Sequence, residues 1–171
     1  MNQGKYVFTQ IASFLPQRVF DRIIKEYDGN YRVRHFTCWN QMMAMIGQLS
    51  NRDSLRDLVL TINAHPSKLY HMGFGKSISK SNLALANEQR PFEIYEAFAY
   101  HLIGEARKIC LNIDIEFSFS YAVYAFDSTT IDLCLNTFCW ATFRKAKGAV
   151  KIHTQYDIRT SIPVFMEVTP A

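Results

Sequence analysis

Asp127 is the residue of this 171-residue chain whose type and position most suggest chemistry. It follows the apolar run 121–126 and precedes the short polar run 128–130. A continuous apolar run of this length is typical of a strand buried on both faces, which predicts a central strand that ends in a turn. A carboxylate there is costly unless it is paired or binds a metal. Taken alone, Asp127 fits either an ordinary turn residue or a Mg²⁺ ligand for phosphoryl transfer.

A basic segment downstream of Asp127 is the second candidate. Lysine and arginine neutralise phosphates, and exposed aromatic rings can stack on bases, so the segment favours DNA contact near Asp127. A solvated basic hairpin is the alternative. Lys151 and His153 are two positions apart on an expected strand and should point the same way, so that His153 either faces DNA or is a hydrogen-bonded structural histidine. The candidate DNA-binding residues of this segment are Arg144, Lys145, Lys147, Lys151 and His153, with Trp140 and Phe143 among them.

A third candidate is the start of a helix after the glycine-punctuated loop 70–78. Either Ser79 or Ser81 can cap this helix by accepting a backbone N–H. If it is the second helix of a helix-turn-helix, its polar residues could contact phosphates and base edges. The alternative is a plain capped helix that packs through Leu83 and Leu85. The candidate DNA-binding residues here are Lys76, Ser79, Lys80, Ser81 and Asn82.

The predicted secondary structure around these candidate residues differs between the two parts of the chain. Apolar residues recur every three or four positions in the segments 9–25, 36–49, 55–62 and 91–109, which predicts helices. Pro16 interrupts the first segment. We expect residues 1–112 to form one helical domain, in which the aromatic and methionine stripes form the core: Trp39, Met42, Met43, Phe92, Tyr95 and Phe98.

From about residue 119 the apolar period changes from helical to alternating. Alternation over 131–136, 150–158 and 162–168 predicts consecutive antiparallel strands with short connections. Because helices and strands are segregated along the chain, we expect an α+β fold with a helical domain at 1–112 and a sheet domain at 119–171.

The amino-acid composition limits the classes to which this protein can belong. Hydrophobic residues make up 49% of the chain and charged residues 20%, which is typical of a globular protein. A net charge of +4 permits nucleic-acid binding without requiring it. No segment approaches the ~20 apolar residues of a membrane span, so we expect a soluble intracellular protein. The four cysteines are expected to be free thiols, without the spacing of a zinc site: Cys38, Cys110, Cys134 and Cys139.

Two parts of the sequence resemble insertion-sequence transposases of the IS4 family, which are of the DDE type. The stretch 124–131 is similar to the strand that carries the family's first aspartate, and 138–153 is similar to its Trp-Ala, Arg, Lys-Gly-Ala-x-Lys-x-His run. The N-terminal half resembles the helical DUF4372 domain that precedes the catalytic core in one branch of the family. That likeness rests on Arg34-x-Phe36, Trp39, Ser54–Asp57, Leu69–Gly73 and Ser81–Asn87.

This resemblance implies a fold, a reaction and partners. The fold would be a ribonuclease-H-like (RNase H-like) core that begins with three antiparallel strands, with Asp127 as the first member of an Asp-Asp-Glu catalytic set. The cofactor would be Mg²⁺ or Mn²⁺, and the reaction would be the cutting and rejoining of DNA in transposition. The partner would be the transposon ends, with a homodimer possible, in the bacterial cytoplasm at the nucleoid.

Only the first catalytic carboxylate is expected within these 171 residues. Asp132 and Asp157 lie in the wrong places to replace the second aspartate or the glutamate, so we expect a truncated core that is inactive alone. A catalytically inactive DNA-binding relative, acting as an inhibitor or remnant, is the alternative function. A helical interaction module that binds no nucleic acid is a third hypothesis.

Overall fold

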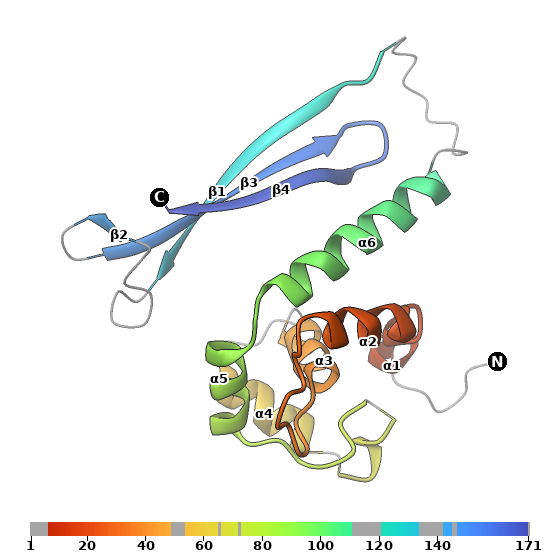
Figure 1. Ribbon diagram of the computed structural model, residues 1–171, viewed down its shortest axis with the longest axis vertical. Helices are drawn as coiled ribbons and strands as arrows, with labels where there is room; N and C mark the ends of the chain where they lie inside the picture. The colour runs from red at the N-terminus through yellow and green to blue at the C-terminus, as the bar shows by residue number, and fades with distance from the viewer. Residues whose placement is uncertain are drawn as a thin grey trace. The chain divides into compact units, whose positions relative to one another are not determined.

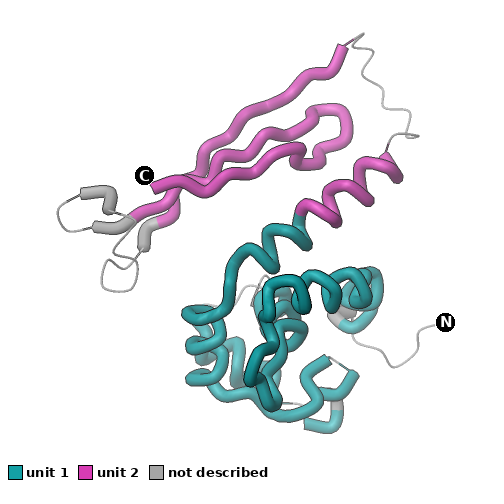
Figure 2. The backbone as a smooth tube through the Cα atoms, in the orientation of Figure 1, with its two compact units in different colours: residues 1–99 teal, residues 100–171 magenta. Residues whose placement is uncertain are grey.

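The computed structural model describes residues 7–48, 54–64, 66–71, 73–110, 121–133, 142–144 and 147–170 (Figure 1). The chain divides into two compact units, residues 1–99 and residues 100–171 (Figure 2). We call them the helical unit and the sheet unit. The expected α+β arrangement is confirmed, because the helices precede an antiparallel sheet. The boundary falls within the last helix, which itself ends at Cys110.

The helical unit is built from short helices and the first turns of a longer one. The segment 9–25 forms two helices, as the interruption at Pro16 indicated. Pro16 is the residue before the second helix, and proline cannot continue the backbone hydrogen bonding of a helix. The elements in chain order are α1 (Val7–Ala12), α2 (Gln17–Glu26), α3 (Cys38–Gln48), α4 (Leu55–Asn63), a 3-10 turn (Pro66–Lys68), α5 (Lys80–Gln89) and α6 (Glu93–Cys110).

Serine side chains cap the N-termini of two of these helices. Ser54 accepts a hydrogen bond from the Asp57 N–H at 3.2 Å at the start of α4. Ser79 accepts one from the Asn82 N–H at 3.1 Å at the start of α5, so the first of the two candidate serines is the cap of α5. Such a cap stabilises a helix by about 1 kcal/mol.

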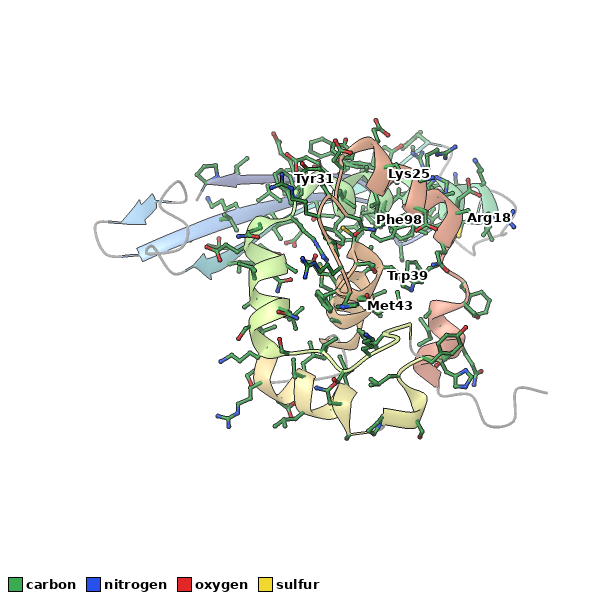
Figure 3. All side chains as sticks on the ribbon, turned by 60° about the horizontal axis from the view of Figure 1, so that its bottom comes forward. Arg18, Lys25, Tyr31, Trp39, Met43 and Phe98 are labelled. Atoms are coloured by element: carbon green, nitrogen blue, oxygen red, sulfur yellow. The ribbon has the colours of Figure 1, made fainter. Side chains whose placement is uncertain are left out.

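The core of the helical unit surrounds Phe20, which is fully buried on α2. Its ring centroid lies 4.7 Å from that of Phe98, which is buried, and 5.9 Å from that of Trp39, which is half-buried; Figure 3 labels both residues together with Met43. One expected core residue is corrected: Phe92 is 66% exposed, because it precedes the first turn of α6 and the buried face of that helix begins at Ile94.

The sheet unit contains three long antiparallel strands: β1 (Tyr124–Leu133), β3 (Lys147–Asp157) and β4 (Ile162–Pro170). β3 is the middle strand and pairs with both β1 and β4, while the short β2 (Thr142–Arg144) pairs with the start of β3. The hydroxyl of Tyr100 on α6 donates to the Met166 carbonyl at 2.7 Å and accepts from the Met166 N–H at 3.3 Å. Tyr100 therefore binds the backbone of β4.

Two expectations about β1 are corrected. The run 121–126 was expected to form a central strand, yet β1 pairs only with β3 among the described strands, and Phe126 is 68% exposed. The expected turn at 127–130 is also wrong, since β1 continues through it without a break in register. Thr129, Thr130 and Ile131 are β-branched and suit a strand, which explains why pairing with β3 continues past Asp127.

Candidate nucleic-acid interface and the Asp127 strand

Asp127 lies in the middle of β1, opposite Thr154 of β3, which in turn pairs with Met166 of β4. Its side chain is exposed, and the hydroxyl of Thr129 donates a hydrogen bond to its Oδ2 at 2.9 Å. Because Thr129 is two positions along the same strand, both side chains share one face of the sheet. The strand therefore holds the carboxylate in place on an open surface.

The described residues do not complete a metal site around Asp127. They contain no group of three or more histidine, cysteine, aspartate or glutamate side chains that could hold a metal ion. Asp157 lies at the far end of the β1–β3 pairing, opposite Tyr124, and its Oδ1 accepts the Arg159 N–H at 2.9 Å in the turn before β4. A two-metal centre needs several carboxylates around one point, whereas Glu167 pairs with His153 and so lies on the face of the sheet opposite to Asp127.

Of the basic segment, the two residues with described side chains, Lys151 and His153, do not lie beside Asp127. His153 pairs with Ser128, one position along from the Asp127–Thr154 pair, so His153 and Lys151 lie on the face of the sheet opposite to Asp127. The Lys151 and His153 side chains do share a face, as expected from their spacing. Arg144 and Lys147 lie on β2 and β3, but their side chains, and Lys145 as a whole, are outside the described residues.

The structure favours the structural role for His153. Its Nε2 lies 3.1 Å from the Thr169 hydroxyl, and its ring stacks on that of Phe126 with centroids 5.9 Å apart and an interplanar angle of 24°. The imidazole is half-buried and has both a polar and an aromatic partner within the sheet. DNA contact is not needed to explain its position.

The candidate residues at the start of α5 form an exposed polar surface. Lys76, Ser79, Lys80, Ser81 and Asn82 are all exposed. The helix is fixed below them: Leu83 and Ala86 are buried, and the Asn63 side chain exchanges two hydrogen bonds with the Ile78 backbone, at 2.7 and 3.0 Å. Leu85, which was also expected to pack, is instead 49% exposed. A buried inner face and an exposed polar surface therefore occur on the same helix, and DNA contact through that surface stays a prediction.

A cleft of about 600 Å³ lies next to this surface, between residues 27–36 and α5. Asn82 lines it, together with basic and aromatic residues that sequence analysis did not select as binding residues. The Arg-x-Arg-His run at 32–35 was the available signal, but on its own it does not show that α5 faces it. The polar and aromatic residues of the first wall are Tyr27, Asp28, Tyr31, Arg32, Arg34, His35 and Phe36.

Arg90 connects the two walls of the cleft. Its Nη1 donates to the Thr37 carbonyl and to Gln41 Oε1, each at 2.9 Å, and its Nη2 donates to the Phe36 carbonyl. The Tyr95 hydroxyl donates to the same Gln41 oxygen at 2.7 Å. The guanidinium at the end of α5 thus holds the end of segment 27–36 in place. Burial raises the pKa of the Tyr95 hydroxyl, which therefore stays protonated and remains a donor.

Cys38 lies under the same segment and is buried as a free thiol, as expected. Its Sγ donates to the Gly29 carbonyl at 3.1 Å. Burial of the thiol raises its pKa, with the nearby Arg90 charge acting in the opposite direction. Cys110 is also free and partly exposed, whereas Cys134 and Cys139 lie outside the described residues. A neutral, buried Cys38 is a packing residue.

Comparison with known families gives one match. The family described as Domain of unknown function (DUF4372) matches residues 3–75, which is less than half of the chain. No curated protein and no solved structure matches the sequence. The match confirms the resemblance of this segment to the DUF4372 domain. The structure adds that the helical unit extends to residue 99, since α5 and the first turns of α6 supply Leu83, Ile94 and Phe98 to its core. None of the described helices is long and apolar enough to cross a membrane.

Proposed function

We propose that this chain acts in DNA transposition as part of a DDE transposase of the IS4 family. In this proposal the helical unit binds the transposon ends, and β1 carries the first aspartate, Asp127, of an RNase H-like core. The match over residues 3–75 supports the proposal, because that domain occurs in transposase-like proteins. Three long antiparallel strands in succession, with Asp127 on the first, also agree with the expected start of such a core.

The distribution of charge is the observation that carries the DNA-binding part. Residues 1–99 contain twelve lysines and arginines and eight aspartates and glutamates, whereas residues 100–171 contain seven of each class. The net charge of +4 therefore belongs to the helical unit. Exposed cations on a folded surface attract the phosphates of DNA. Lys76 and Lys80 are both exposed, just before and at the first residue of α5.

A catalytically inactive DNA-binding protein is the second candidate function. It is favoured by the single carboxylate that the described sheet places at Asp127, because one carboxylate cannot hold two metal ions in a closed geometry. Mg²⁺ or Mn²⁺ would be the cofactor in the transposase. A homodimer paired through the open side of β1, in the cytoplasm at the nucleoid, fits either candidate.

Binding of the whole chain to a labelled DNA duplex, measured from about 50 to 200 mM salt with and without Mg²⁺, tests the proposal. We expect the logarithm of the affinity to fall linearly with the logarithm of the salt concentration. Asp127→Ala should leave the affinity unchanged without Mg²⁺. A gain in affinity with Mg²⁺ that Asp127→Ala abolishes would support the transposase over the inactive protein. Absence of binding at the lowest salt would overturn both.

A further inference from the structure

The cleft between residues 27–36 and α5 combines cations, an exposed ring and amide side chains with one carboxylate, Asp28, around one space. Its volume of about 600 Å³ is within the usual range of ligand sites. Tyr31 is 70% exposed, and both Arg32 and Arg34 are exposed. The two guanidinium groups form no ion pair with any side chain in the described parts of the chain. They are therefore available to an anionic ligand.

Arg32 has a backbone conformation that its side chain does not favour. Its φ is +56°, in the left-handed region where residues other than glycine, asparagine and aspartate are uncommon. Its guanidinium carbon lies 5.0 Å from the centroid of the Tyr31 ring. An arginine held in a strained conformation over a tyrosine ring is a feature from which a function can be inferred. The segment presents a pre-positioned cation beside an aromatic surface.

The opposite wall of the cleft supplies neutral hydrogen-bonding groups. Asn82 and Gln89 lie on α5 and line the cleft, and both are exposed. Amide side chains both donate and accept hydrogen bonds, so they can contact phosphate oxygens, sugars or base edges. Arg90 donates hydrogen bonds to the Phe36 and Thr37 carbonyls, which keeps α5 next to the wall formed by residues 27–36.

We propose that this cleft holds the sugar–phosphate backbone of a DNA strand, with phosphates at Arg32 and Arg34. The inference rests on the proposed DNA-binding function and assigns it a specific surface. Phosphate contacts position a protein on DNA, and arginine recognises phosphate by paired hydrogen bonds. Arg90 is a positioning residue here, because its guanidinium is bound to the protein backbone. Asn82 both lines the cleft and belongs to the exposed polar surface at the start of α5, so in this proposal it contacts DNA.

Two double variants of the whole chain test the assignment. Arg32→Gln with Arg34→Gln removes two charges from the cleft. Arg18→Gln with Arg22→Gln removes two charges from exposed positions on α2 that do not line the cleft; Figure 3 labels Arg18 on α2 and, apart from it, Tyr31 of the cleft. The cleft variant should lower the slope of log affinity against log salt by about 1.8, since each phosphate contact contributes about 0.9. The α2 variant should leave the slope nearly unchanged.

A third variant separates a binding role from a structural one. Arg32→Gly suits the positive φ and should keep or raise the melting temperature of the chain, while lowering its affinity for DNA. Equal losses of salt slope in the two double variants would overturn the cleft assignment and leave general DNA binding intact. Unchanged affinity in Arg32→Gly would also overturn it. If the unaltered chain binds no DNA, the proposed function fails together with the cleft.

Discussion

The helical unit and the sheet unit differ in how they bury their apolar side chains. Phe98 on α6 is 2% exposed, whereas Phe126 on β1 is 68% exposed. Among the described residues, Ala149 and Val150 are the buried apolar residues of the sheet unit, and the helical unit holds the rest of the core. The helical unit thus has both a core of its own and the net positive charge. Stability and DNA binding should therefore respond to substitutions there more strongly than to substitutions in the sheet.

The largest expected effect is on the free energy of unfolding of the helical unit. Phe98→Ala should lower it by about 3 to 5 kcal/mol, because the Phe98 ring packs against Phe20 in the core. Phe126→Ala is the matched control on β1 and should change it by less than about 1 kcal/mol. Urea unfolding of both variants, followed by circular dichroism, measures the difference. Similar losses in the two variants would contradict the contrast between the units.

A smaller effect is expected where the helical unit has no space for a methyl group. A Cβ at Gly29 would overlap Ile94 Cδ1 and lie 2.9 Å from Cys38 Sγ, so Gly29→Ala should cost about 1 to 3 kcal/mol. Gly104 on α6 has no atom within 4 Å of its Cβ position, and Gly104→Ala should stabilise the helix by about 0.5 to 1 kcal/mol. Thermal melting compares the two, and stabilisation by Gly29→Ala would show that the core is looser than described.

The pH dependence of stability should also originate in the helical unit. Burial raises the pKa of the Cys38 thiol and of the Tyr95 hydroxyl, so the folded state holds these protons more tightly than the unfolded chain. Their stabilising effect is complete below the unfolded pKa and is lost as pH rises through the folded one. Stability should decline above about pH 8.5, the usual range for cysteine.

Urea unfolding between neutral and alkaline pH tests this dependence. Cys38→Ala should reduce the first part of the decline, and Cys110→Ala, at a less buried thiol, is the control. A decline that is identical in the two variants would assign it to other groups.

The smallest effect is expected at Asp127. Asp127→Asn keeps the shape of the side chain, and its hydrogen-bond partner Thr129 can still donate to the amide oxygen. We expect the melting temperature and the Mg²⁺-free affinity for DNA to stay within error of the unaltered chain. A marked loss of DNA affinity would place the sheet unit, and not only the helical unit, in the binding surface.

Local sequence patterns predicted the helices and strands better than they predicted which of their faces are buried. The helices α3, α4 and α6 and the order of the three long strands follow from hydrophobic periodicity, whereas α5 was expected from two possible capping serines, of which Ser79 is the cap. Periodicity does not tell a buried strand from an exposed apolar one, which is why β1 was expected to be central. It also gave no sign that Asp127 and His153 lie on opposite faces, since that depends on cross-strand register.

The cleft could not be predicted from any single segment. Its walls come from residues 27–36 and from α5, which are more than forty positions apart in the sequence. The contact between them depends on Arg90, whose role as a donor to the Phe36 and Thr37 carbonyls is a tertiary feature. Arg34-x-Phe36 is one of the motifs that resemble the transposases, but the sequence assigns it no role. The structure places Arg34 in the wall of the cleft that residues 27–36 form.

Hydrogen–deuterium exchange of the whole chain, with and without a DNA duplex, shows which of the two units binds DNA. We expect DNA to slow exchange in residues 27–36 and 76–90, while exchange in β1, β3 and β4 is unchanged. Slower exchange confined to 124–170, with none in the helical unit, would contradict this expectation.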